Sequence, residues 1–222
     1  MNRIHITALI ILVASTWGIT LSLHGVSLTS QYLTPFSISV TVVSAAMMAF
    51  DKWAWAWAIW RGWFVKRPDL RGTWRVTFQS NFVPQGDGPA PPTAAYMVVR
   101  QTYSKLSMRL HTPESSSHLL GSEIVTNGDE TFEVVGVYRN EPDLAVEHRS
   151  PMHRGCLLLW VEGTPPTSLT GRYWTDRTFE QNGAQRNTLG TIRLTDRRPE
   201  LAYSHDEAEA LYSGGGLQPA TA

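Results

Sequence analysis

The N-terminal part of this chain contains no Asp, Glu, Lys or Arg between Ile4 and Phe50, and no later segment of similar length lacks charge. A helix that crosses the hydrocarbon core of a bilayer needs about 20 apolar residues. The uncharged segment is long enough for two such helices, which we predict at about residues 4–23 and 34–50. The sequence HGVSLTSQYLT between them is rich in Gly, Ser and Thr and suits a short turn.

A cleaved signal peptide followed by one membrane span is the alternative interpretation, because Arg3 precedes an apolar stretch. Residues 14–16 read AST, a poor cleavage site, and a second apolar segment follows directly, so two spans are favoured. The turn between the spans has no Lys or Arg, whereas basic residues lie before the first span and after the second. The positive-inside rule then predicts a multi-pass membrane protein with both termini in the cytoplasm.

The segment after Phe50 is rich in tryptophan and reads DKWAWAWAIWRGWF. Four of its aromatic residues have the spacing of one helical face, on which indole rings can lie among lipid headgroups: Trp53, Trp57, Trp60 and Phe64. We therefore predict that residues 1–66 form a two-helix transmembrane hairpin with a Trp-rich interfacial end.

Residues 67–203 consist of short runs of alternating apolar and polar residues, separated by Gly, Pro, Asn and Ser. Alternation with a period of two predicts strands. We expect eight of them, at about 72–80, 95–102, 105–112, 118–125, 131–139, 155–162, 169–177 and 189–196. Short strands without a long helix between them predict an antiparallel barrel or sandwich. The expected fold class is a membrane-anchored all-β protein, with two transmembrane helices followed by an eight-stranded antiparallel β-barrel that can hold one small ligand. Residues 84–93 are expected to form a Pro/Gly loop, and residues 204–222 a flexible tail.

Charge and motifs argue against several functions. The 19 Lys and Arg residues balance 19 Asp and Glu residues, so we expect no basic surface for long DNA or RNA. The histidines lack metal-ligand spacing, and the chain has neither a Gly-x-Ser-x-Gly elbow nor a phosphate-binding Gly loop. Cys156 begins an apolar strand and is expected to be a small buried hydrophobe. We therefore expect a receptor and not an enzyme, without a catalytic residue, a metal ion or a cofactor.

Several predicted strands have one face that begins apolar and becomes polar along the strand. A barrel with these faces turned inward would be filled at one end, and at the other end it would present Gln101, Tyr138, Asn140, Tyr173, Thr175 and Arg177. A few converging polar groups above an apolar floor are typical of a small-molecule site. The alternative is that these residues lie on a solvated rim, and alternation alone does not decide between the two. His153 belongs either to the same rim or to a solvated loop.

The order of the motifs behind the two predicted spans resembles that of a known family, the two-transmembrane, β-strand-rich effectors of bacterial cyclic-oligonucleotide antiphage signalling systems (CBASS). The resemblance covers about residues 5–198. It is carried by FDKWAW, PDLRGTW, Gln101 in the second strand, VYRNEP, HRGCLLLW, LTGRYWTDR and LGTIRLTDR.

This resemblance implies that the barrel binds a cyclic dinucleotide made by a partner nucleotidyltransferase of the CD-NTase type. Binding would promote self-assembly of the membrane segments, disrupt the bacterial inner membrane and kill the infected cell. The expected partners are thus the dinucleotide, the lipid bilayer and further copies of the chain. In this reading Arg177 would contact a phosphate, Tyr138 and Tyr173 would stack on bases, and Gln101 and Asn140 would read base edges or ribose.

Two alternatives remain open at this stage. Gly72-Thr73-Trp74 also resembles the Gly-x-Trp of lipocalin-like barrels, which carry apolar ligands, and in either fold we expect Trp74 to close the barrel floor. The other alternative is a membrane scaffold whose barrel binds a protein.

Overall fold

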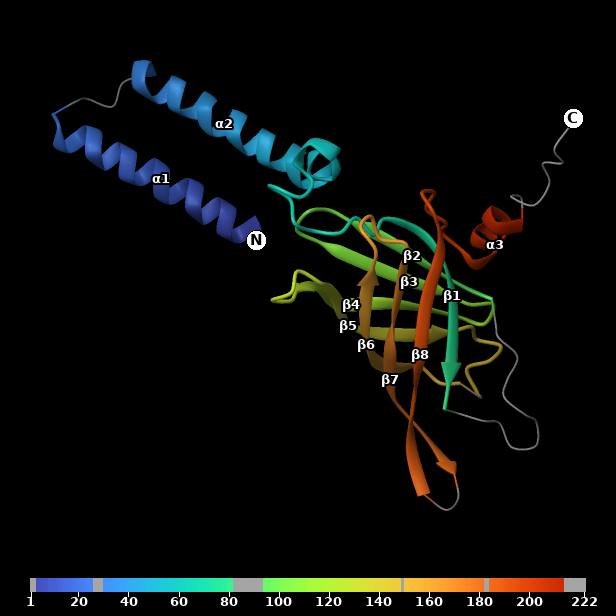
Figure 1. Ribbon diagram of the computed structural model, residues 1–222. Helices are drawn as coiled ribbons and strands as arrows, with labels where there is room; N and C mark the ends of the chain where they lie inside the picture. Colours follow the sequence, from blue (N-terminus) through green and yellow to red (C-terminus); the bar gives the residue numbers. More distant parts are fainter. Residues whose placement is uncertain (1–2, 26–29, 82–93, 149, 182–183, 214–222) are drawn as a thin grey trace, which may run out of the picture. The chain divides into compact units, whose positions relative to one another are not determined.

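The computed structural model describes residues 3–25, 30–81, 94–148, 150–181 and 184–213 (Figure 1). The chain divides into two compact units. The first is formed by Met1–Phe64 together with Thr102–Ser104, and the second by Val65–Gln101 together with Lys105–Ala222. The Pro/Gly loop expected at 84–93 lies outside the described residues.

The first unit contains two long helices, α1 at Arg3–Leu23 and α2 at Ser30–Lys52. Two 3-10 turns follow, η1 at Ala54–Ala56 and η2 at Ala58–Trp60. Trp57 lies between the turns and has an extended backbone, with φ −67° and ψ 142°. The expectation of a single helical face through the Trp-rich segment was therefore wrong, because the α-helix ends at Lys52, before the first of the four aromatic residues.

The end of α2 is held by contacts within the first unit. The Phe50 ring packs edge-on against Trp60 and Tyr103, with centroids 6.1 and 5.5 Å away. The backbone N–H of Ser104 donates to the Asp51 carboxylate at 2.9 Å, and the N–H of Tyr103 donates to the Asp51 carbonyl at 2.9 Å. Asp51, in the last turn of α2, thus accepts hydrogen bonds that tie the end of the helix to residues 103 and 104.

The prediction of two membrane-spanning helices was wrong for the part of the chain that the structure describes, in which no helix is both long and apolar enough to cross a bilayer. The expected location, that of a multi-pass protein in a bacterial inner membrane with both termini in the cytoplasm, rested on these two spans and was also wrong. The prediction treated the absence of charge as if it were apolarity. Ser and Thr are uncharged but lower the mean hydropathy, and α2 carries them along its length before ending at Asp51 and Lys52.

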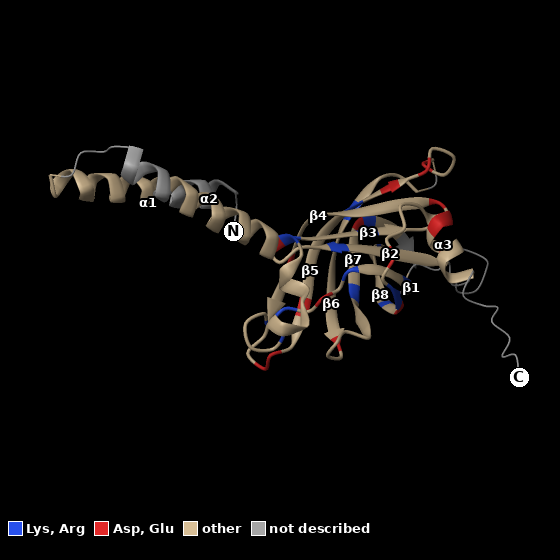
Figure 2. Ribbon diagram, turned by 90° about the horizontal axis from the view of Figure 1, so that it is seen from above, with Lys and Arg blue, Asp and Glu red and all other residues tan. Residues whose placement is uncertain are grey.

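The second unit is built on a closed antiparallel barrel, in which each strand pairs with the next and β8 pairs with β1. Both signs of charge occur over the barrel (Figure 2). The strands are β1 (Gly72–Ser80), β2 (Ala95–Gln101), β3 (Leu106–His111), β4 (Ser115–Thr126), β5 (Phe132–Pro142), β6 (His153–Glu162), β7 (Ser168–Gln181) and β8 (Ala184–Arg198).

The eight-stranded antiparallel barrel predicted from alternation is confirmed, and each expected strand overlaps an observed one. The observed β4 and β7 are longer than predicted. The pairing register shifts between Leu119 and Gly121 in β4, and between Trp174 and Thr178 in β7. Such irregularities interrupt the strict alternation of inward and outward residues. A prediction based on that alternation therefore made these two strands too short.

One end of the barrel interior is closed by apolar side chains. Trp74 is fully buried there, as predicted for the floor, and its indole N–H donates to the Leu70 carbonyl at 2.9 Å. Gln101 is buried beside this plug. Its side-chain oxygen accepts from the Leu70 N–H, and its amide N–H donates to the Pro68 carbonyl, both at 2.9 Å. Gln101 therefore fastens the segment that covers the floor.

A third helix, α3 at His205–Ser213, covers the outer face of β2. Tyr96 stacks on Tyr212, with ring centroids 5.2 Å apart, and Ala208 is fully buried at this contact. The Tyr212 hydroxyl lies 2.8 Å from the Thr73 carbonyl and 2.6 Å from the Asp196 carbonyl. A flexible tail was expected from residue 204, whereas the structure has α3 there; residues 214–222 lie outside the described part.

We expect Tyr212→Phe to lower the free energy of unfolding by about 1 kcal/mol, because a hydroxyl shared between two backbone carbonyls is lost. Burial raises the pKa of Tyr212 to about 12, above about 10 in an unfolded chain. The stabilisation that this phenol adds to the folded state is thus fully present below pH 10 and is lost as the pH rises towards 12. Urea unfolding at pH 7 and across pH 10–12 measures both effects, and the exposed Tyr203→Phe is the control. Equal stability and pH dependence of Tyr212→Phe and wild type would contradict the assignment.

We expect Gln101→Met to lower the free energy of unfolding by about 1–3 kcal/mol, since a buried N–H and a buried carbonyl lose their partner. Urea unfolding followed by tryptophan fluorescence measures the change. Gln79→Met, at an exposed position on β1, is the matched control and should change stability little. A Gln101→Met protein as stable as the control would show that the Gln101 hydrogen bonds do not hold the floor.

Candidate functional site

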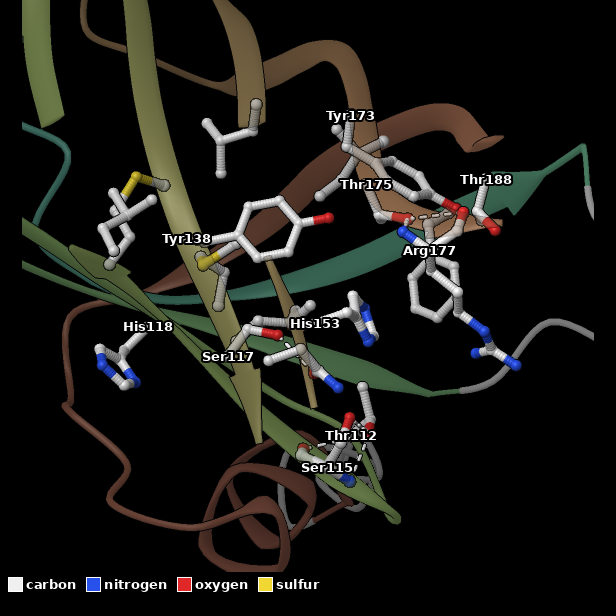
Figure 3. A pocket seen from close by; sticks show the side chains of 18 of the residues that line it. Thr112, Ser115, Ser117, His118, Tyr138, His153, Tyr173, Thr175, Arg177 and Thr188 are labelled. Carbon is white, nitrogen blue, oxygen red and sulfur yellow. Dashed lines mark hydrogen bonds between the residues drawn. The ribbon is translucent and has the colours of Figure 1, made fainter. Parts of the chain in front are cut away.

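The open end of the barrel interior forms a cavity of about 260 Å³. Its floor is apolar and includes Met97, Met108, Leu157 and Ile192. Its upper part is lined by hydroxyl, amide, imidazole and guanidinium groups (Figure 3). An apolar base with a few converging polar groups is the usual composition of a small-molecule site.

The register of the strands places the polar groups in two neighbouring cross-strand rows. In one row Ser117 of β4 faces Asn140 of β5, which faces His153 of β6. The Ser117 hydroxyl donates to the Asn140 side-chain oxygen at 2.7 Å, and both residues are buried. Because this bond occupies the amide oxygen, the Asn140 side-chain NH₂ is left as the group with which the row can donate to a ligand.

The next row contains Tyr138, Gly155 and Thr175. A Cβ atom added at Gly155 would lie 2.5 Å from the Tyr138 hydroxyl, and one added at Gly190 would lie 2.8 Å from the Tyr173 ring. Each tyrosine therefore occupies the space that a missing side chain leaves free. The two glycines allow Tyr138 from β5 and Tyr173 from β7 to lie within the cavity (Figure 3).

Burial raises the pKa of both of these phenols and so makes them harder to ionise. Desolvation is the largest cause that raises the pKa of Tyr138, and the neighbouring Tyr173 adds to it. Desolvation also raises the pKa of Tyr173, although a hydrogen bond with Ser80 acts in the opposite direction. The two rings therefore offer flat aromatic faces and hydroxyl groups that carry no negative charge at physiological pH.

Arg177 supplies positive charge to the cavity. It follows Thr175 on β7, where its backbone N–H donates to the Thr175 hydroxyl at 3.1 Å and its guanidinium donates to the Ser150 hydroxyl at 3.2 Å. His118 and His153 also line the cavity, and none of the described lining residues is Asp or Glu. An anion entering this space would meet a guanidinium without meeting a carboxylate.

The structure brings together Tyr138, Asn140, His153, Tyr173, Thr175 and Arg177, all of which line the cavity as expected. It places Gln101 at the opposite end of the barrel, where it binds Pro68 and Leu70. Neighbouring strands are antiparallel, so the polar end of β2 lies at the floor, whereas the polar ends of β5 and β7 lie at the mouth. The sequence pattern showed which face of β2 points inward but not its direction.

Several lining residues were missed by the sequence reasoning: Phe78, Ser80, Thr112, Ser115, Ser117, His118, Ser150 and Thr188. Ser117 could have been found, because it alternates with Leu119 on the inward face of β4. Ser150 lies between β5 and β6, where no periodic pattern points to it.

Residues 65–195 match the family described as Cap15, cyclic dinucleotide receptor domain, and the match covers more than half of the chain. The chain is also similar to CD-NTase-associated protein 15 of Escherichia albertii. The two are 23% identical over 162 residues, which cover 72% of this chain and 79% of that protein. The matched region contains β1 to β7, most of β8 and the residues that line the cavity. The chain therefore belongs to the Cap15 cyclic dinucleotide receptor domain family.

Proposed function

We propose that the barrel binds a cyclic dinucleotide in the cavity at its open end, and that the chain is a non-enzymatic effector of a CBASS antiphage system. The single observation that carries this proposal is the composition of the cavity. Arg177 and two neutral tyrosines face a space whose described lining has no carboxylate. The signal itself would come from a partner nucleotidyltransferase of the CD-NTase type.

The cavity residues match the parts of a cyclic dinucleotide. The guanidinium of Arg177 can form charge-assisted hydrogen bonds with a phosphate. The faces of Tyr138 and Tyr173 can stack on bases, which favours any base because each has a π-face. The free NH₂ of Asn140, held by Ser117, can donate to a base or ribose oxygen. His153, on the same row as Asn140, would contact the ligand at the mouth.

The lipocalin-like alternative, an apolar ligand in the same cavity, is less well supported. Its floor would accept an apolar group, since Met97 and Met108 lie there. Such a ligand would however displace water from the Arg177 guanidinium and the Asn140 NH₂ without offering either a hydrogen-bond acceptor, which costs free energy. The polar half of the cavity therefore favours a ligand with phosphates and heterocyclic bases.

Binding can be tested by isothermal titration of the purified protein against a panel of cyclic dinucleotides. Arg177→Ala should lose a charge-assisted bond of about 1.5–3 kcal/mol, which weakens binding roughly ten- to hundred-fold. Tyr138→Ala should weaken binding comparably, because base stacking is worth about 1–3 kcal/mol. Arg193→Ala is the matched control, since Arg193 lies exposed on the outer face of β8. Folded Arg177→Ala and Tyr138→Ala proteins that bind as tightly as wild type would refute the proposed site.

We also propose that ligand binding promotes self-assembly of the chain. Large apolar side chains are exposed on the helices of the first unit, including Leu12 and Ile19 of α1 and Val42 and Met48 of α2, each at least 60% exposed. Exposed apolar surface of this kind favours association. Membrane disruption was expected to follow from two membrane spans, which the described residues do not contain.

Saturating cyclic dinucleotide should shift the wild-type protein to a larger mass in multi-angle light scattering, because the ligand favours the assembling state. The mass of Arg177→Ala at the same ligand concentration should increase less, because a smaller fraction of its sites is occupied by ligand. Leu12→Glu combined with Val42→Glu should bind the ligand normally but fail to shift. An unchanged mass of the wild type at saturation, with binding confirmed by titration, would contradict ligand-promoted assembly.

A further inference from the structure

The outer surface of the barrel carries an apolar area over β5, β6 and β7, which are neighbouring strands (Figure 1). We call this area the outer wall. Its most exposed members, Val135, Val137 and Trp174, are 41%, 45% and 46% exposed. It consists of Val135, Val137, Cys156, Leu158, Trp160 and Trp174.

The outer wall is continuous across the strands. Val137, Cys156 and Trp174 face one another in one row, and Leu189 of β8 extends the row. In contrast, the outward residues of β1 between Arg75 and Gln79 are polar. The apolar outer face of β2 is covered by α3. Within the described part of the barrel unit the outer wall has no such cover, and contiguous exposed apolar surface of this kind marks an interaction site.

Two opposite charges flank the outer wall at one level. The row that contains Val135 and Leu158 continues to Glu123 on β4 at one side and to Arg172 on β7 at the other. Both charged side chains are exposed. Within the described residues, neither forms an ion pair or a hydrogen bond through its side chain. An unpaired acid and an unpaired base therefore lie at equal distances from the midline between β5 and β6.

We infer that the outer wall is the contact between two copies of this chain, related by a two-fold axis that runs along the strands between β5 and β6. Rotation about this axis exchanges β4 with β7 and β5 with β6, and it keeps each row at its level. Glu123 of each copy then faces Arg172 of the other, and Val135 faces Leu158. In this row the surface is complementary to itself, as a symmetric dimer requires.

The same rotation matches side-chain size. Trp174 of one copy faces Gly121 of the other, because both lie in the row of Val137 and Cys156. Gly121 has open space around its Cβ position, with no atom within 4 Å. The largest side chain of the wall thus meets a residue that has no side chain. The wall curves away at β4 and β7, so the long side chains of Glu123 and Arg172 are suited to reach across the edges.

A second copy is favoured over a lipid surface as the occupant. Glu123 and Glu133 lie beside the apolar residues, and the Trp160 indole N–H donates to the Glu133 carboxylate at 3.1 Å. Taking these carboxylates out of water into the apolar part of a bilayer would cost free energy. The pairing of Glu123 with Arg172 is also a property that only a second copy of the same surface would use.

Charge reversal of the full-length protein tests this contact in the absence of any cyclic dinucleotide. Sedimentation velocity over a range of protein concentrations should show a dimer for wild type. Glu123→Arg and Arg172→Glu should each weaken the dimer by about tenfold or more, because each variant places two pairs of like charges across the interface. The double variant with both reversals should return to within about threefold of wild type, because the pairs are restored with opposite sign. Arg109→Glu, which makes the same charge change on β3 beyond β4, is the matched control.

Cross-linking gives a second measurement that does not depend on the variants. Cys156 is the chain's single cysteine and lies beside the proposed axis, so a short bismaleimide should join two copies of wild type. A monomeric wild type, or a double variant as weak as either single one, would overturn the inference. A monomer that binds phosphatidylcholine vesicles, and loses this binding in Trp174→Glu, would assign the wall to lipid and also overturn it. Binding of cyclic dinucleotide should be unchanged in the charge variants, since Glu123 and Arg172 lie on the outer face. The test of the contact between copies is therefore independent of the proposed function.

Discussion

Closure of the barrel by the pairing of β8 with β1 is the constraint on which the rest of the structure depends. Once the sheet is closed, no strand edge remains, and every inward side chain must share one interior. That interior is filled at one end by Trp74, Leu159 and Leu169, which are fully buried. At the other end, Gly155 and Gly190 leave room for the rings of Tyr138 and Tyr173, and a cavity remains between the strands.

The cavity is shaped as much by absent side chains as by present ones. Gly155 and Gly190 come from different strands, yet each lies against the tyrosine that its neighbouring strand supplies. Such rows arise from pairing register, which aligns residues that are distant in the chain. The rigid sheet thus holds the aromatic rings, Asn140 and Thr175 before a ligand arrives. Preorganisation of this kind reduces the ordering cost of binding.

The inner and outer faces of the same strands serve different roles. On β5, Tyr138 and Asn140 point into the cavity, whereas Val135 and Val137 point outward to the outer wall. Alternation along a strand makes this possible, since neighbouring residues lie on opposite faces. Ligand recognition and contact between copies can therefore be changed by separate substitutions. The family match covers residues 65–195, so α3, which covers β2, lies beyond it.

Sequence alone determined the eight strands, the inward faces of β5 and β7 and the burial of Trp74, because a period of two and the preference of apolar groups for the interior are local properties. It was misleading for the first unit, where absence of charge was taken for apolarity. It also placed Gln101 at the mouth, because a strand's pattern does not reveal which way the strand runs. Only the tertiary structure decided the end of the barrel at which each polar residue lies, the rows that pair Ser117 with Asn140 and Tyr138 with Gly155, and the cover of α3 on β2. These depend on register and on contacts between distant segments, which are settled when the whole sheet closes.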